Sequence, residues 1–176
     1  MTRLQTGVQN LAIDRLGNYY YNRGGELYRW VPERTESVCD ETVSGERNGP
    51  LTAADGVTCL SGATVRGPVT VAPGAGLVVT GSELSGQLST TGAAVVELSD
   101  STVRGPVRLL GVSDSLVLDG SRVHGPVEVT GSGAGPVLAG NTVTGPLRCS
   151  GNEPAPTNDG RPNTVSGPAV GQCAGL

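Results

Sequence analysis

Valine and leucine recur along the chain at a nearly constant distance from one another. They stand in a repeated phrase, x-Val-x-Gly-Pro-Val, whose first clear copy spans residues 64–69. A period near twenty predicts a repeat architecture in which each turn covers the apolar residues of the next. The leading apolar residues are Val65, Leu84, Val103, Val123, Val143 and Val165, which lie 19, 19, 20, 20 and 22 residues apart.

Each repeat contains three short segments in which apolar and polar residues alternate. In residues 116–135 the segments are separated by Gly or Gly-Pro corners and followed by a Gly-rich loop. Strict alternation is typical of β-strands. The pattern therefore predicts an all-β fold, a right-handed parallel β-helix (a three-faced solenoid) with about 19–20 residues per rung and six to seven rungs. The loops vary in length, whereas left-handed hexapeptide helices keep a stricter turn of about eighteen residues, which favours the right-handed form.

The alternation also predicts which side chains face the core. A few buried side chains per rung, each worth about 1.5–3 kcal/mol, are enough to drive stacking. Besides the leading residues, the predicted inward columns are Val69, Leu88, Val107, Val127 and Leu147; Val71, Thr90, Leu109, Val129 and Cys149; and Leu77 with Val79, Val96 with Leu98, Leu116 with Leu118, and Pro136 with Leu138. A polar column at one corner, which we expect to form hydrogen bonds from rung to rung, consists of Ser82, Ser101, Ser121 and Asn141.

One outward column is unexpectedly apolar. Val78, Val117 and Val137 should face outward, with only Glu97 interrupting them. A sheet that is apolar on both faces is normally covered. We expect either the N-terminal segment or another copy of the chain to cover this candidate interface.

Residues 1–37 differ from the rest and contain every aromatic residue of the protein. Residues 18–22 and 26–31 read as two strands joined by a turn, which predicts a β-hairpin that caps the β-helix of residues 38–176 or joins it to an upstream region. The hairpin supplies the candidate ligand-binding residues, an aromatic platform on which sugar rings could stack. The alternative is that these residues cover the first rung or the apolar outer sheet. The candidates are Tyr19, Tyr21, Tyr28 and Trp30.

Composition narrows the possible partners. The chain has 176 residues, 28 Gly, 12 Pro and no Phe, and its formal net charge is −4 with no Lys among its twelve cations. This balance argues against a nucleic-acid surface, which needs clustered positive charge. No run of eighteen apolar residues exists, so no membrane span is expected. Met1-Thr2-Arg3 opens no signal peptide; the chain is either cytosolic or part of a longer exported protein.

The four cysteines favour the exported alternative. Cys39 with Cys59 and Cys149 with Cys173 are 20 and 24 residues apart, so the partners of each pair fall on neighbouring turns. Two disulfides at the two ends of the solenoid suit an oxidising compartment, which predicts a secreted or cell-surface protein. A zinc site would lack any close Cys-x-x-Cys pair. We expect neither a metal nor a cofactor, and we expect residues 151–176 to form a stapled cap.

Few residues are candidates for catalysis, and no catalytic residue is predicted. The single histidine, His124, lies in an outward column, without a nucleophile or an acid at a triad position. Glu97 and Asp119 should share an outer face, one rung apart, where a two-carboxylate glycosidase is conceivable. The loops are too short to build the usual cleft, so a charged surface is favoured. Arg108, Glu128 and Arg148 are expected to form an inter-rung ion-pair ladder of little net energy.

The Val-x-Gly-Pro-Val rungs resemble the right-handed β-helix repeats of bactofilins, which form filaments. The stretch from Cys149 to Cys173 is more similar to the terminal β-helix module of exported actinobacterial proteins. The resemblance covers residues 38–176 and implies fold and export more than activity.

Three functional hypotheses follow. The first is a non-catalytic structural or attachment module of an exported protein, whose candidate contacts are carbohydrate or a cell surface. The second is a self-assembling structural protein that forms an oligomer or filament through the apolar outer sheet. The third is a polysaccharide-active β-helix enzyme.

Overall fold

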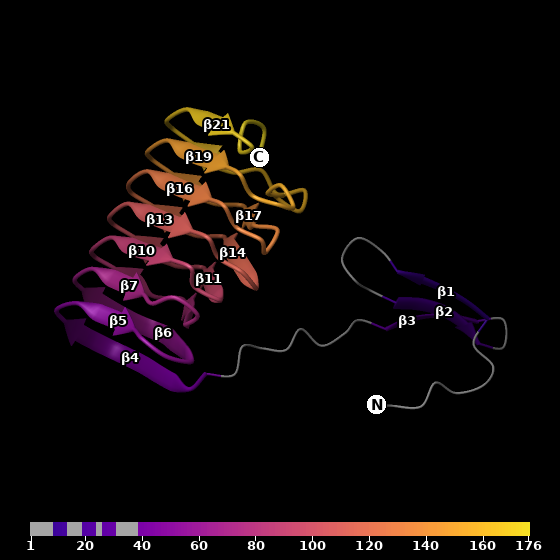
Figure 1. The fold of residues 1–176 in the computed structure, drawn as a ribbon, viewed down its shortest axis with the longest axis horizontal. Helices are drawn as coiled ribbons and strands as arrows, with labels where there is room; N and C mark the ends of the chain where they lie inside the picture. The colour runs from indigo at the N-terminus through magenta and orange to yellow at the C-terminus, as the bar shows by residue number, and fades with distance from the viewer. Residues whose placement is uncertain (1–8, 14–18, 24–25, 31–38) are drawn as a thin grey trace. The chain divides into compact units, whose positions relative to one another are not determined.

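The computed structural model describes residues 9–13, 19–23, 26–30 and 39–176. The chain divides into two compact units, residues 1–36 and 37–176 (Figure 1). Each unit has its own sheets, and each is described by itself below.

The N-terminal unit contains a three-stranded antiparallel sheet of β1 (Gln9–Ile13), β2 (Tyr19–Arg23) and β3 (Glu26–Trp30). The predicted hairpin is present as β2 and β3, and β1 is an additional strand that the sequence analysis did not predict. Four of its five residues pair with β2, with a shift of register between Gln9 and Leu11, and apolar Leu11 and Ile13 stand at alternate positions. An isolated two-stranded hairpin is marginally stable in water, and a third strand stabilises it. The predicted turn at residues 24 and 25 lies outside the described residues.

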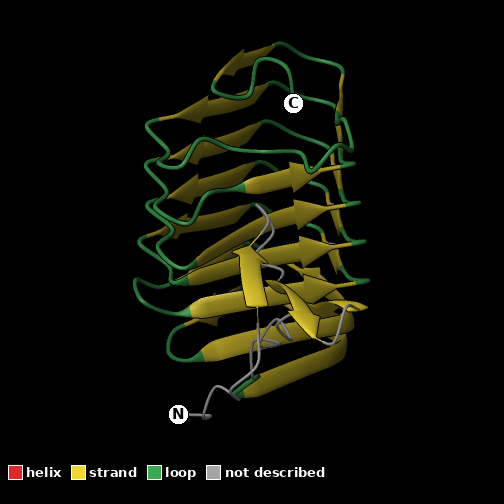
Figure 2. Ribbon diagram, turned by 90° about the vertical axis from the view of Figure 1, so that its right-hand side faces the viewer, coloured by secondary structure: helices red, strands yellow, loops and turns green. Residues whose placement is uncertain are grey.

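The second unit is a parallel β-helix, as the repeat predicts. All of its strand pairs are parallel. The described residues contain no helix, and therefore none that could cross a membrane. Successive rungs stack with their strands side by side (Figure 2). About seven turns result, because the third face alone stacks seven strands.

Two of the three faces are continuous, because β4 and β6 are long enough to turn the corner between them. The first half of β6 pairs with β8 and the second half with β9. The strands of the first face are β4 (Glu41–Asn48), β6 (Val57–Arg66), β8 (Gly76–Thr80), β11 (Val95–Ser99), β14 (Ser115–Asp119) and β17 (Val137–Ala139). The second face continues with β9 (Glu83–Leu84), β12 (Thr102–Val103), β15 (Arg122–Val123), β18 (Thr142–Val143) and β20 (Thr164–Val165).

The third face is a separate sheet with a constant register. Leu88 lies in register with Val107, and Val107 with Val127, so equivalent residues of successive rungs form straight columns. Its strands are β5 (Leu51–Ala53), β7 (Val69–Val71), β10 (Leu88–Thr91), β13 (Val107–Leu110), β16 (Val127–Thr130), β19 (Leu147–Ser150) and β21 (Ala169–Gly171).

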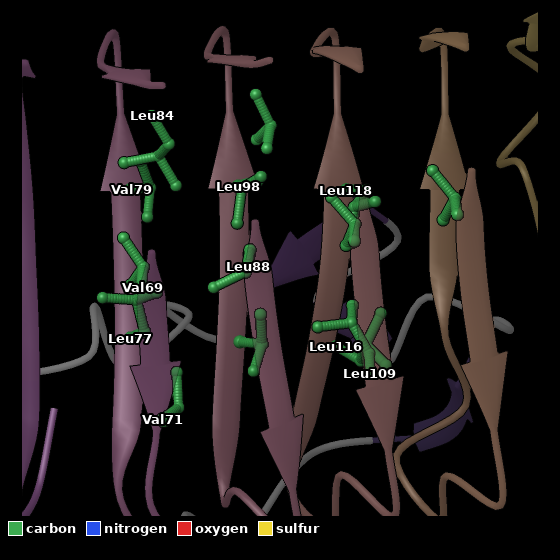
Figure 3. Close-up of a cluster of buried hydrophobic side chains, with 14 of the residues drawn as sticks. Val69, Val71, Leu77, Val79, Leu84, Leu88, Leu98, Leu109, Leu116 and Leu118 are labelled. Atoms are coloured by element: carbon green, nitrogen blue, oxygen red, sulfur yellow. The ribbon is translucent and has the colours of Figure 1, made fainter. Parts of the chain in front are cut away.

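The predicted inward residues form one continuous core along the solenoid axis. Figure 3 shows part of it, with valine and leucine side chains from successive rungs stacked on one another. Every predicted inward residue is buried except Val165, which is half-buried. Val165 belongs to β20, the last strand of the second face, so no further rung covers it.

A ladder of buried polar side chains runs along the corner between the first and second faces, where it was predicted. The Ser82 amide donates to Ser101 Oγ at 3.1 Å, and the Ser101 amide donates to Ser121 Oγ at 3.2 Å. The Ser121 amide donates to Asn141 Oδ1 at 2.9 Å, and the Asn141 amide to Asn163 Oδ1. Each side chain thus satisfies a backbone N–H of the preceding rung, which would otherwise be buried without a partner.

Replacing Ser121 by alanine removes the acceptor of the Ser101 amide and leaves this N–H buried. We expect S121A to lower the free energy of unfolding by about 1–3 kcal/mol, measured by urea denaturation. The control is S61A, because Ser61 is an exposed residue of β6. Equal stability of the two variants would show that the ladder does not support the stack.

Glycines at the corner between the second and third faces permit close stacking of the rungs. A Cβ on Gly145 would lie 2.6 Å from the carbonyl carbon of Gly125, one rung earlier, and a Cβ on Gly125 would lie 3.0 Å from that of Gly105. Real side chains do not approach a backbone so closely. The glycine of the Gly-Pro phrase is therefore required by contact between neighbouring corners.

We expect G145A to destabilise the β-helix by about 1–3 kcal/mol or more, because the added methyl group forces the corners apart. The matched control is G133A. A Cβ on Gly133 would meet its nearest atom, the Ser113 carbonyl oxygen, only at 3.9 Å. Thermal unfolding followed by circular dichroism compares the two variants, and an unchanged Tm for G145A would contradict the close-packing argument.

The two ends of the stack are closed in different ways. At the N-terminal end, Arg47 of β4 lies in register with Val65, so a charged residue occupies a position of an inward column. Charged residues at such positions oppose pairing of one sheet edge with another. At the C-terminal end, a turn over residues 171–176 places Cys173 in the core, fully buried, and packs Leu176 against it.

Candidate functional site

The aromatic residues predicted to bind a ligand occupy matching positions in the N-terminal sheet. Tyr19 pairs with Trp30, and Tyr21 pairs with Tyr28, across the antiparallel strands β2 and β3. Because strand positions alternate between two faces, these four positions belong to the same face of the sheet. The contacts of their side chains lie outside the described part of the structure.

The apolar outward column lies on the first face, at the predicted positions. Val78 is in register with Glu97, Glu97 with Val117, and Val117 with Val137. All four residues are half-buried rather than exposed, because each side chain is covered in part by its neighbours one rung above and below. Among the residues for which burial is described, the one large apolar residue that is exposed is Val170 of β21, at 39%.

The two carboxylates considered for catalysis are each engaged by a partner of their own. Ser115 Oγ donates to Glu97 Oε1 at 2.7 Å. Asp119 Oδ1 lies 2.6 Å from Arg161 Nη1, in an ion pair that raises the pKa of the arginine. Glu97 and Asp119 lie on the predicted face, one rung apart. Each interacts with its own partner, Glu97 with a serine and Asp119 with an arginine.

The second face carries charged residues that pair from rung to rung. Arg104 Nε donates to Glu83 Oε1 at 2.7 Å, and Arg66 Nε lies 3.0 Å from Glu46 Oε1. The hydrogen bond with Arg104 lowers the pKa of Glu83. Such exposed pairs contribute little to stability. His124 is exposed beside them, as predicted, and its backbone amide donates to the Val103 carbonyl.

A hollow of about 350 Å³ lies on the third face, next to the Gly-Pro corner. Its lining includes Pro126 and Pro146 from the corner and Arg108, Glu128 and Arg148 from β13, β16 and β19. The predicted ion-pair ladder is only partly formed. Arg108 Nε is 3.8 Å from Glu128 Oε2, which is longer than a hydrogen bond.

The two predicted disulfides are both present and play different structural roles. The Cys39–Cys59 bridge, with Cα atoms 5.6 Å apart, involves the outward column, since Cys59 is in register with Val78. The Cys149–Cys173 bridge, with Cα atoms 5.2 Å apart, lies inside the core at the C-terminal end. The first ties the chain entering the β-helix to the outer surface of β6, and the second fastens the terminal cap.

We expect the double variant C149A/C173A to lose about 2–4 kcal/mol of stability, because the open chain gains conformational freedom when unfolded. Alanine is preferred to serine because it buries no hydroxyl group. Guanidinium denaturation of this variant, compared with C39A/C59A, measures how much each end contributes. Full retention of stability in both double variants would contradict a stapling role.

A second polar ladder, which was not predicted from the sequence, lies at the corner that follows the third face. The Ser132 amide donates to Asn152 Oδ1, and the Asn152 amide donates to Gln172 Oε1, each at 2.9 Å. The signal was available, since all three residues follow a glycine directly, as Ser82, Ser121 and Asn141 do. The hollow was missed as well, because its lining comes from three separate rungs.

Among the described residues, no group of three or more His, Cys, Asp or Glu residues is placed to hold a metal ion.

The arrangement of strands and corners defines the protein as a parallel β-helix protein. The chain matches no protein-family model, and comparisons with curated proteins and with solved structures found no significant match. The likeness to bactofilins and to actinobacterial modules is therefore supported at the level of the β-helix fold alone.

Proposed function

We propose that the protein is a non-catalytic, rigid β-helical module of an exported protein, which attaches to carbohydrate or to a cell surface. The observation that carries the proposal is the closure of the stack by two disulfides, one at each end. Disulfides persist in oxidising compartments, where a rigid appendage must remain folded without chaperones. The proposed location is therefore secreted or cell surface.

The attachment role is further supported by how the side chains are used. Core residues, both polar ladders and the corner glycines all serve contact between rungs, so the outer faces are free to vary without loss of the fold. Solenoids of this kind offer extended binding surfaces of fixed geometry. The matched positions of Tyr19, Tyr21, Tyr28 and Trp30 add an aromatic face in the N-terminal sheet, of the type on which sugar rings stack.

Self-assembly is the second candidate, and the outer column of Val78, Val117 and Val137 favours it. Growth from end to end is opposed by Arg47 at one end and by the disulfide-bonded turn at the other. An oligomer would therefore form laterally, through the first face.

The attachment role is tested with the oxidised full chain and a panel of insoluble polysaccharides. We expect retention on at least one of them, without release of soluble sugar, and a loss of roughly tenfold or more in affinity for the variant Y28A/W30A. The matched control is Y20A, because Tyr20 occupies a position of the opposite face of the sheet. Release of soluble fragments would contradict the non-catalytic assignment. No retention, together with a stable oligomer in light scattering, would favour self-assembly.

A further inference from the structure

Arginines recur beside the Gly-Pro corners of an otherwise acidic chain. From the corner at Gly67 onward, residues within two positions of the corner Gly or Pro include four arginines, one histidine and one carboxylate, whereas the whole chain has a net charge of −4. The acidic residues Glu97, Asp100, Asp114 and Asp119 belong instead to the first face and the loops beside it. The corner residues concerned are Arg66, Arg104, Arg108, His124, Glu128 and Arg148.

Two of these arginines already have a full partner, and two do not. Arg66 and Arg104 are held by Glu46 and Glu83 at hydrogen-bonding distance. Arg108 and Arg148 stand in one register column, on either side of Glu128. The single carboxylate lies too far from Arg108 for a hydrogen bond.

Because Arg108 shares only a loose ion pair with Glu128, the two guanidinium groups keep hydrogen-bond donors for a ligand. Arg108 is 66% exposed, and Arg148 is exposed as well. A guanidinium has five N–H donors and prefers a carboxylate, which it can hold by two parallel hydrogen bonds. Since rungs stack at about 4.8 Å, the two arginines are separated by about 10 Å along the solenoid axis. That separation suits two carboxylates carried by one extended chain.

We propose that the hollow on the third face binds an acidic polysaccharide, through Arg108 and Arg148, with the sugar chain running along the solenoid axis. The inference rests on the proposed attachment function and names its ligand class. Pro126 and Pro146 line the hollow, and we infer that the C–H face of a sugar ring packs against their apolar rings. The guanidinium groups hold the carboxylates at either end of this sugar ring.

Glu128 selects sugar over an acidic peptide. Its carboxylate, 44% exposed, stands between the two arginines and accepts hydrogen bonds only. A ligand that fits must present hydrogen-bond donors between its two carboxylates, and the hydroxyl groups of a sugar ring do so. The side chains of an acidic peptide offer carboxylates but no such donors, so they would leave Glu128 without a hydrogen-bonding partner.

Calorimetric titration of the oxidised full chain with a decameric oligogalacturonate tests the proposal. We expect binding that weakens as salt is added and that disappears when the carboxyl groups are methyl-esterified. R108Q and R148Q should each reduce affinity by about ten- to a hundredfold, because each removes a charged hydrogen-bonding partner. E128Q should not show this loss of affinity. The glutamine side chain still accepts hydrogen bonds, and the repulsion between Glu128 and the ligand carboxylates is removed.

The matched control is R122Q, which removes an exposed arginine of β15 on the second face. Binding that is absent, that survives esterification, or that falls equally in R122Q would overturn the proposal. Poly-glutamate that binds as tightly as oligogalacturonate would also overturn it, in favour of an acidic protein partner. If R108Q and R148Q leave the binding of oligogalacturonate unchanged while Y28A/W30A abolishes retention on polysaccharide, the attachment function is supported and the binding site at Arg108 and Arg148 is refuted.

Discussion

Each rung of this protein depends on the next one for its hydrogen bonds and for its buried surface. A single rung carries only a few apolar side chains, and alone it would leave them in water together with a row of unpaired backbone groups. Stacking in constant register solves both problems at once. The same register brings serine and asparagine side chains under the corner amides of the preceding rung and glycines against the preceding corner. The two ends of the stack each lack a neighbouring rung, and each is closed by a disulfide.

Because the stack is maintained by inward and corner residues, the outward residues are free to serve other purposes. The first face presents valines and carboxylates, the second face paired charges, and the third face a hollow between two arginines. A rigid scaffold that displays several chemically different strips along one axis is suited to holding an extended partner. This is the physical basis for an attachment role, and the solenoid needs no deep cleft to fulfil it.

Most of the fold could be predicted from the sequence, because a repeat shows the same physical requirement several times over. The inward columns, the ladder of Ser82, Ser101, Ser121 and Asn141, and both disulfides follow from spacing alone. The third strand of the N-terminal sheet did not follow, because β1 has no repeat to reinforce its short alternating pattern. The hollow at Arg108 and Arg148 could not be foreseen either, since whether Glu128 neutralises both arginines depends on side-chain distances and not on register.

The central claim, that stacking between rungs holds the fold, is tested most directly by native-state hydrogen exchange of the corner amides. The amides of Ser82, Ser101 and Ser121 lie outside the strands, yet each donates to a side chain of the following rung. The account predicts that they exchange as slowly as the amides of the adjacent strands and open together with them in one cooperative unit. Exchange at the rate of exposed loop amides would show that the ladder is not formed, and it would contradict the account.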